Sequence, residues 1–416
     1  MSATKNVITI TSPISKRTRI RQHLSAGLLD SLLHPPSPQP NIEEDRIGKA
    51  LRESIVTNNL PSPVAVVSIP NQGRGLVATK PLRKGEIGVC LPWSEVITPQ
   101  RAAAHLTATS PPLSVLGPVE EDIVSTLPAW SLIALFLADL LLLQQQRAQI
   151  TSDNDVLACY TATLPSSTGC VLEWSDEQVE AWLQGSYLHT LGKEIRKAFE
   201  TSWDELSSLP TPIPKDLGRH CFALVLSRLI RVDTEEVSGS TEVVAPFIDL
   251  INHSSTSTSF LSYDATLSGI VWKADKEYKS GEQIFASYGQ KTNGELLLSY
   301  GFIPDTNPYD ACLIEIEQNV FPVRMGAVPQ EMIDYFMNSG NGSGNGSEKH
   351  ALQCIIDTLK SKKYGITIED AKNELDEIQN TIDGRTRAMV LRVLIQEQKI
   401  IARTTFLLKQ RIKTLS

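Results

Sequence analysis

Short apolar runs separated by turn-forming residues dominate the first hundred positions of the chain. Apolar and β-branched residues at 64–69, 76–79 and 87–91 predict three strands. Between them, 71–75 and 84–86 are rich in glycine and polar residues, a composition typical of turns. This region is therefore expected to be β-rich, with the glycines of 71–75 in a turn.

A long stretch from residue 99 to 220 has apolar residues at helical spacing instead. Helices are predicted at 130–149, at 175–188, within 191–209 and at 217–231. The segment 130–143 is the most apolar, but its fourteen residues fall short of the roughly twenty that a membrane span requires, so we predict a buried helix. Strands are predicted again at 243–251, 269–273 and 283–287. A β-rich region interrupted by helices indicates an insertion within one domain.

Residues 1–41 have a polar and Pro-rich composition that predicts a disordered tail, with an amphipathic helix over 42–58 after it. The first 29 residues contain five Lys or Arg and no acid, and they lack the apolar run of a secretory signal. Their composition also resembles a mitochondrial transit peptide, and the basic run 16–21 resembles a nuclear signal. We therefore expect a cytoplasmic or nuclear protein, with mitochondria as the alternative.

Composition narrows the class of protein further. The 416 residues carry 39 Lys and Arg against 47 Asp and Glu, a net charge of −8, and 41% of them are hydrophobic. These values are typical of a soluble globular chain of two or three domains and argue against nucleic-acid binding through bulk charge. The six cysteines are scattered and form no C-x-x-C pair, so we expect reduced thiols and no metal site.

The C-terminal quarter is predicted to contain a loop followed by helices. Residues 338–347 are rich in Gly, Asn and Ser, which predicts a flexible loop. From 384 to 416 the chain carries eight Lys or Arg and one acid, with apolar residues at helical spacing. The basic residues form either a solvated face or a docking surface for an acidic partner, which reversal of Arg403 and Arg411 would test.

Three segments combine glycines, compact polar groups and aromatic residues. The first, 73–78, reads Gly-Arg-Gly-Leu-Val-Ala and matches a dinucleotide-binding fingerprint, but a strand and a turn are predicted where that fingerprint needs a helix. Its glycines fit a turn, or a place where the backbone closely approaches a ligand. The second, 247–254, places Asn252 and His253 after an apolar run. The third, 281–302, has two Tyr-Gly pairs around a short predicted helix. Each polar group alone also fits a core residue that only satisfies a hydrogen bond.

In this order, the three segments resemble those of the SET-domain protein methyltransferases, in the branch typified by the Rubisco large-subunit lysine methyltransferase. Trp130 and the apolar run after it, the stretch from Tyr160 to Pro165, and Trp174 before a helix are similar to that branch's helical insert. The resemblance implies an α+β fold with a SET β core of small twisted sheets, an inserted helical subdomain and an all-α C-terminal domain. It implies a SET domain over 42–305, with the insert at about 99–220, and a substrate-binding domain over 310–416.

The resemblance also implies a role for individual residues. For S-adenosylmethionine binding it implies Gln72, Gly73, Arg74, Gly75, Leu76, Arg228, Asp249, Asn252, His253, Tyr300 and Phe302. Tyr288 corresponds to the catalytic tyrosine, and Tyr263, Tyr288 and Tyr300 to residues that contact the substrate. One departure is Leu229, which stands where the family has an aromatic residue.

The chemistry of methyl transfer suits these residue types. A lysine amine of ordinary pKa is almost wholly protonated at pH 7, and an apolar aromatic channel lowers that pKa by desolvation. A tyrosine hydroxyl can then orient the neutral amine toward the sulfonium methyl group. We therefore expect a monomeric, S-adenosylmethionine-dependent protein-lysine N-methyltransferase that acts on a non-histone protein, such as a ribosomal or translation protein, without nucleic acid, membrane or metal. The alternatives are a protein-histidine methyltransferase and a SET-fold binding module without catalytic activity.

Overall fold

The computed structural model describes residues 43–55, 62–70, 72–109, 114–146, 155–206, 209, 213–236, 239–338, 347–378 and 382–415, which belong to one compact unit. The tail predicted over 1–41 and most of the loop predicted over 338–347 lie outside the described residues. The predictions for these two segments are therefore not tested here.

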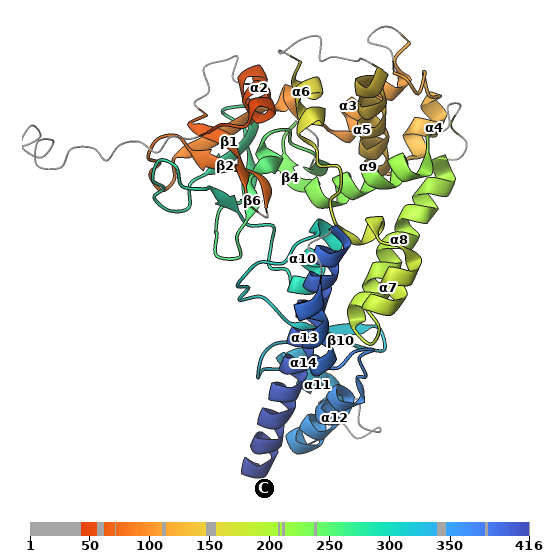
Figure 1. Cartoon of the computed structure of the whole chain (residues 1–416), viewed down its shortest axis with the longest axis vertical. Coiled ribbons are helices and arrows are strands. Elements are labelled where there is room, and N and C mark those ends of the chain that lie inside the picture. Colours follow the sequence, from red (N-terminus) through yellow and green to blue (C-terminus); the bar gives the residue numbers. More distant parts are fainter. Residues whose placement is uncertain are drawn as a thin grey trace, which may run out of the picture. The chain divides into compact units, whose positions relative to one another are not determined.

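Small sheets form the first part of the fold (Figure 1). The antiparallel pairs are β1 (Val64–Ile69) with β2 (Gly73–Ala78), and β4 (Ile230–Thr234) with β5 (Gly239–Val243). A three-stranded sheet has the order β3 (Ile87–Pro92), β8 (Gly269–Lys273) and β7 (Leu261–Asp264). The two-residue strands β6 (Asn252–His253) and β9 (Phe285–Ala286) pair in parallel. This last pair brings together two segments that are more than thirty residues apart in sequence.

Between β3 and β4 the described residues form helices and no strand (Figure 1). These are α3 (Pro99–Thr107), α4 (Glu121–Thr126), α5 (Ala129–Gln146), α6 (Val156–Thr163), α7 (Asp176–Trp182), α8 (Tyr187–Leu206) and α9 (Lys215–Arg228). Helix α2 (Arg46–Ile55) precedes β1. Most side chains of α5 are buried on every face, as expected for a helix that is apolar all round. Over the parts of the chain described here, no helix is both long and apolar enough to cross a bilayer.

The C-terminal region is built mainly from helices that pack on the long helix α14 (Ile382–Thr414). It contains the hairpin of β10 (Cys312–Ile316) and β11 (Asn319–Val323), followed by α11 (Gln330–Asn338), α12 (Glu348–Ser361) and α13 (Ile368–Glu377). Helix α10 (Asn293–Tyr300) and the insert share a cluster with α14, in which Trp174, Leu297 and Leu394 are buried. The α+β class is confirmed, and the helical C-terminal region contains one hairpin that the sequence analysis does not place.

Two local predictions need correction. The glycines of 73–75 lie in β2 and not in a turn, because Gly73 pairs with Ile69 and Gly75 with Val67. The strand predicted over 243–251 ends at Val243, and Ile248–Leu250 form a short 3-10 helix, η5. Phe247 precedes this helix with φ 72°, in the left-handed region, which reverses the chain there.

Candidate functional site

A buried ion pair stands at the centre of the candidate site. Arg228, the last residue of α9, donates from Nη1 to Oδ2 of Asp249 in η5, at 3.1 Å. The Tyr160 hydroxyl on α6 donates to the same carboxylate oxygen at 2.5 Å. Burial raises the pKa of the Asp249 carboxyl, and Arg228 and Tyr160 offset only part of that rise. Three elements of different kinds are therefore joined at one carboxylate.

Two polar atoms of this ion pair have no hydrogen-bond partner among the described residues. They are Nε of Arg228 and Oδ1 of Asp249, and both are buried. A buried polar group without a partner costs about 1–3 kcal/mol, so native structures rarely keep one without a reason. Packing within the fold therefore does not account for these two buried polar atoms, and a bound ligand would.

The strands β6 and β9 bring Asn252 and His253 beside Tyr288. The backbone N–H of Tyr288 donates to Nδ1 of His253 at 3.0 Å, so this nitrogen carries no proton. Nε2 of His253 then donates to Ser255 Oγ at 3.2 Å. Burial lowers the pKa of the imidazole, which favours the same neutral form. His253 thus acts as a fixed backbone clamp on the segment that carries Tyr288.

Three rings gather around Tyr288. Its ring centroid lies 5.1 Å from that of His253, 5.0 Å from Tyr300 and 6.3 Å from Phe302. The Tyr288 hydroxyl donates to the Ile251 carbonyl at 2.8 Å, which fixes its direction. Burial raises the pKa of Tyr288 well above its ordinary value, so the phenol stays protonated at physiological pH. Its oxygen can therefore accept a hydrogen bond from the amine of a bound ligand that lies among these aromatic rings.

Gly301 connects this aromatic cluster to the insert. It ends α10 in the left-handed conformation, φ 73°, between Tyr300 and Phe302. A Cβ atom at this position would lie 2.0 Å from the Thr168 carbonyl oxygen, so only glycine allows the two backbones to approach. The side chain of Glu173 holds the opposing loop, since it accepts from the backbone N–H groups of Thr168 and Gly169 at 2.8 Å each.

The glycine segment approaches the same site from β2. Asn252 Nδ2 donates to the Arg74 carbonyl at 3.3 Å. A Cβ on Gly75 would lie 2.8 Å from Asn252 Nδ2 and 3.0 Å from Gln283 Nε2. The side chain of Arg74 points elsewhere, because its guanidinium contacts Asp45 and the Thr163 carbonyl. At this point β2 therefore presents only its backbone, with no side chain, to the amide groups of Asn252 and Gln283.

Most of the residues expected from the sequence gather here, but the Arg74 side chain and Tyr263 do not. Tyr263 lies in β7, where its ring packs edge-on against Trp93 at 5.5 Å and its hydroxyl bonds Glu236. It makes no recorded contact with Tyr288, so its predicted contact with a substrate stays a prediction. The sequence analysis did not assign Tyr160 a site role, and the only signal was its place in the insert. It also missed the Ile251 carbonyl, because no side-chain pattern identifies a backbone acceptor.

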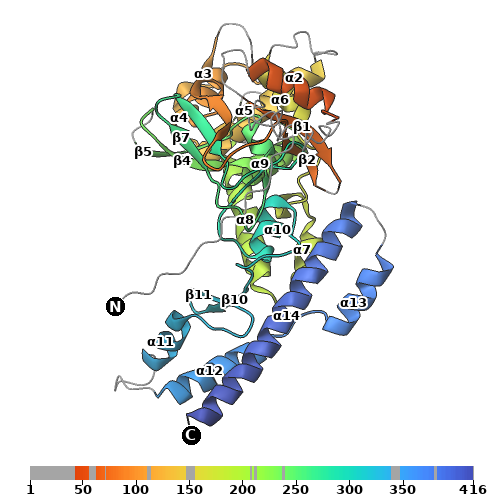
Figure 2. The ribbon, with the colours of Figure 1, turned by 90° about the vertical axis from the view of Figure 1, so that its left-hand side faces the viewer.

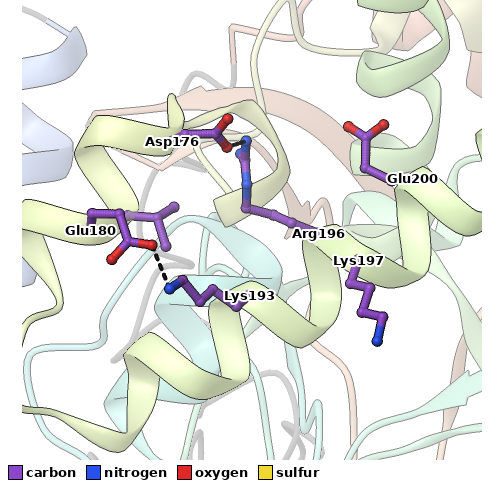
Figure 3. Close-up of a pocket in the computed structure, with 7 residues that line it drawn as sticks. Asp176, Glu180, Lys193, Arg196, Lys197 and Glu200 are labelled. Atoms are coloured by element: carbon purple, nitrogen blue, oxygen red, sulfur yellow. Dashed lines mark hydrogen bonds and ion pairs between the residues drawn. The ribbon is translucent and has the colours of Figure 1, made fainter.

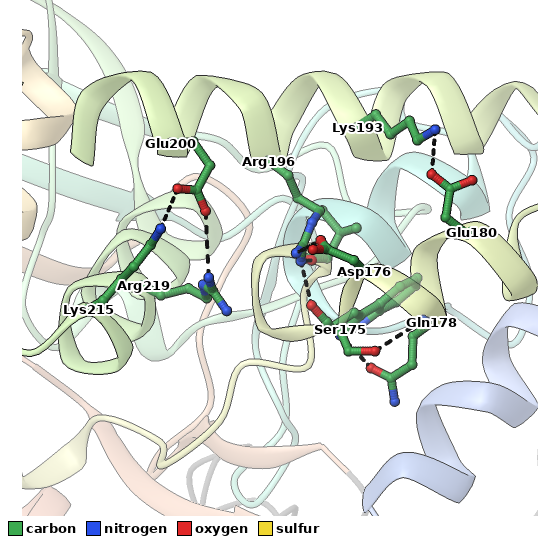
Figure 4. A network of polar contacts seen from close by, with 11 residues as sticks. Ser175, Asp176, Gln178, Glu180, Lys193, Arg196, Glu200, Lys215 and Arg219 are labelled. Atoms are coloured by element: carbon green, nitrogen blue, oxygen red, sulfur yellow. Dashed lines mark hydrogen bonds and ion pairs between the residues drawn. The ribbon is translucent and has the colours of Figure 1, made fainter. Parts of the chain in front are cut away.

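A hollow on the insert is lined by charged side chains (Figure 3). Its lining residues are Asp176, Val179, Glu180, Lys193, Arg196, Lys197 and Glu200. Asp176 pairs with Arg196 and Glu180 with Lys193, which ties α7 to α8. In Figure 4 the contacts continue from Glu200 to basic residues of α9. Each of its carboxylates is already paired with a basic side chain of this chain. These ion pairs therefore hold helices together and do not form a candidate active site.

Known proteins are similar to this chain in sequence over much of its length. A family model described as SET domain matches residues 73–289, just over half of the chain. The chloroplastic ribulose-1,5 bisphosphate carboxylase/oxygenase large subunit N-methyltransferase of Nicotiana tabacum is 25% identical over 369 residues, which cover 78% of this chain and 68% of that enzyme. The actin-histidine N-methyltransferase of Mus musculus is 24% identical over 265 residues, which cover 60% of this chain and 41% of that enzyme.

Solved structures share the fold over most of the chain. The SET domain of LSMT bound to lysine and AdoHcy has a TM-score of 0.65 at 21% identity and covers 89% of this chain and 91% of that one. Rubisco LSMT bound to AdoMet has a TM-score of 0.63 at 20% identity, covering 89% and 92%.

Proposed function

Since the chain belongs to the SET-domain family, we propose that it transfers a methyl group from S-adenosylmethionine to the ε-amine of a lysine in another protein. The observation that carries this proposal is the Tyr288 hydroxyl. Its proton is engaged by the Ile251 carbonyl, so its oxygen is left to act as an acceptor beside the ring cluster. An amine held there would be oriented for an in-line attack.

The residues around the ion pair fit the cofactor. The partnerless Nε of Arg228 is a buried donor suited to a carboxylate, and Asn252 offers an amide next to β2. The missing side chain of Gly75 leaves a space next to that amide which a Cβ would fill. S-adenosylmethionine, when bound, would supply a sulfonium methyl group as the electrophile. The chain's contribution is then to bind, to orient and to exclude water.

The aromatic cluster favours an uncharged amine. Tyr288, Tyr300 and Phe302 present ring faces and edges in place of water, and desolvation lowers the pKa of a lysine ammonium. The raised pKa of the Tyr288 phenol means that it accepts and orients as a neutral group and does not act as a phenolate base. We propose Tyr288 as the catalytic residue, with Tyr300 and Phe302 as the walls of the channel.

We propose a folded, non-histone protein as the substrate, because the insert and the C-terminal region offer surfaces far larger than a short peptide needs. Ribosomal and translation proteins are examples of this class. A second candidate acceptor is a histidine side chain, which the actin-histidine N-methyltransferases among the relatives favour. Acid hydrolysis of the methylated product and amino-acid analysis would separate methyl-lysine from methyl-histidine.

The test is the variant Tyr288→Phe, assayed by transfer of labelled methyl groups into an extract of the organism that encodes the chain. We expect turnover to fall about a hundredfold or more, since a positioned acid–base or orienting group contributes that much. Cofactor affinity, measured by calorimetry, should stay within about twofold. The matched control Tyr187→Phe removes the same atom from α8, outside the cluster, and should leave turnover unchanged.

Full activity of Tyr288→Phe would remove this residue from the mechanism. Cofactor binding without any transfer by the unmodified chain, tested on an extract from cells depleted of the protein, would favour the binding module. Absence of cofactor binding would overturn the proposed function itself.

A further inference from the structure

The long helix α14 is packed against other elements on several sides and keeps one exposed face. In Figure 2 it runs as a single helix with α13 beside one end and α12 beside the other. Its apolar residues Leu391 and Ile395 pack toward α13, and Ile400 and Leu408 belong to the cluster shared with α12. Val390 and Leu394 pack against α10 and the insert, and the face between these contacts and α13 is exposed.

The open face carries a line of cations that we call the cationic stripe. It consists of Arg385, Arg392, Lys399, Arg403 and Lys413, all of which are exposed. With 3.6 residues per turn, their spacings of 7, 7, 4 and 10 place them within an arc of roughly 80°. At 1.5 Å per residue the stripe is about 42 Å long. A one-residue-wide row of this length matches the side of another helix or ridge.

The charges of the stripe are not neutralised by the part of the chain described here. None of its five side chains has a recorded carboxylate partner, whereas Arg387 is held by Glu374 and Arg411 by Glu348. Glu397, the sole acid between 384 and 416, is buried on the other side of the helix. This segment carries +7 in a chain of net charge −8, so the residues before it carry −15.

An exposed aromatic residue interrupts the stripe. Phe406 is 50% exposed, and the Arg403 guanidinium lies 5.7 Å from its ring centroid. A large apolar ring within a row of cations is typical of a protein-binding surface, in which one apolar contact anchors a set of charge pairs. It would contribute little to binding a phosphate backbone.

We propose that the cationic stripe docks an acidic helix or ridge of the protein that receives the methyl group, so this inference rests on the proposed function. The rest of the chain has a net charge of −15 and would repel a long polyanion that extends past the stripe, which favours a short acidic partner over nucleic acid. A bilayer is disfavoured since Phe406 is the one large apolar side chain exposed along the stripe.

The probe is a labelled 21-residue helical peptide with glutamates on one face, and its control is the same peptide with glutamines. Binding to the full chain would be followed by fluorescence anisotropy at 0.05 M and 0.15 M salt, where the Debye length shortens from roughly 14 Å to about 8 Å. We expect the glutamate peptide to bind at both, more weakly at the higher salt, and the glutamine peptide not to bind.

The test variant is Arg392→Glu, Lys399→Glu and Arg403→Glu together, and we expect it to weaken peptide binding about tenfold or more. The matched control Lys360→Glu, Lys363→Glu and Lys372→Glu makes the same change in net charge at exposed positions outside α14 and should stay within about twofold. Arg411 is left unchanged because it pairs with Glu348 of α12. Reversing its charge would break that ion pair and could destabilise the fold. The glutamine variant of the same three stripe positions, expected to weaken binding less, guards against misfolding.

Equal loss in both triple variants, or stripe-dependent binding of a 20-nucleotide RNA or of phosphatidylserine vesicles but not of the peptide, would overturn the inference. Methyl transfer into the extract separates it from the proposed function. If the stripe variant methylates as efficiently as the unmodified chain at low substrate, the docking role is wrong and the function stands. If neither transfers methyl groups but the peptide still needs the stripe, the proposed function fails and a docking surface for an acidic protein remains, without the role of receiving substrate.

Discussion

Two buried carboxylates in different regions of the molecule have opposite surroundings. Asp249, between the insert and β6, faces the Arg228 cation and has 2% of its side chain exposed. Glu397, on α14, is 4% exposed and accepts hydrogen bonds from the Ser186 and Tyr364 hydroxyls, with no cation in contact. Burial raises the pKa of Glu397 to about 7, which its two hydroxyl partners only partly offset.

The difference indicates what each carboxylate is for. A buried carboxylate can stay ionised only if a cation is paired with it. Asp249 is paired with Arg228, although one polar atom on each side chain has no partner among the described residues. A carboxyl group that only joins elements can be neutral, and Glu397 joins α14 to the start of α8 and to the loop after α12 in that way. Asp249 therefore has a cation partner where a ligand is expected, whereas Glu397, with a pKa raised to about 7, is held by two hydroxyl groups.

The largest expected effect comes from breaking the charged pair. Arg228→Met leaves the Asp249 carboxylate buried without a cation, which should lower the free energy of unfolding by about 3–5 kcal/mol. The double variant Arg228→Met with Asp249→Leu should recover most of this loss. Urea denaturation at pH 7.5 measures both, and equal instability of the single and double variants would contradict the coupling.

A somewhat smaller effect, of opposite sign, is expected at the neutral carboxyl. The pKa of Glu397 is higher in the folded than in the unfolded protein, so ionisation destabilises the fold as pH rises from about 4.5 through about 7. Glu397→Gln keeps an acceptor for Ser186 and Tyr364 and should raise the unfolding free energy by about 3 kcal/mol at pH 8.

The same variant should have little effect at pH 4, where the carboxyl is protonated in both states. Thermal unfolding at the two pH values checks this, with the exposed Glu377→Gln as control. A gain that is the same at both pH values would show that ionisation is not its cause.

The smallest expected effect is on cofactor affinity, at the site that contains the charged pair. Gly75→Ala pushes a methyl group against Asn252 and Gln283, and we expect cofactor affinity to fall about tenfold, which is 1.4 kcal/mol. Calorimetry measures the affinity and thermal unfolding the cost to the fold. Unchanged affinity with a lowered melting temperature would mean that this glycine serves the strand alone.

The sequence analysis identified the segments of the site because each has a local signature of glycine, amide or aromatic residues. It could not predict how Asp249 is presented, because the positive φ of Phe247 breaks an apolar run that otherwise resembles a strand. It missed the hairpin of β10 and β11 for a related reason. That two-residue turn contains Glu317 at φ 55° and no glycine, so no turn-forming residue marks it. The neighbours of Tyr263 depend on the β7–β8 register, which a single sequence does not reveal.

The pairing of β2 with the segment before β9 bears on how the chain is made. The Ala78 amide donates to the Glu282 carbonyl and the Ile284 amide to the Leu76 carbonyl, both at 2.9 Å, across more than two hundred residues. A ribosome needs on the order of ten to forty seconds to add that many residues. During this interval the hairpin of β1 and β2 has α2 beside it, but β2 lacks the segment that later bonds to its edge. Slower elongation across the insert would therefore prolong its exposure to chaperones and to premature aggregation.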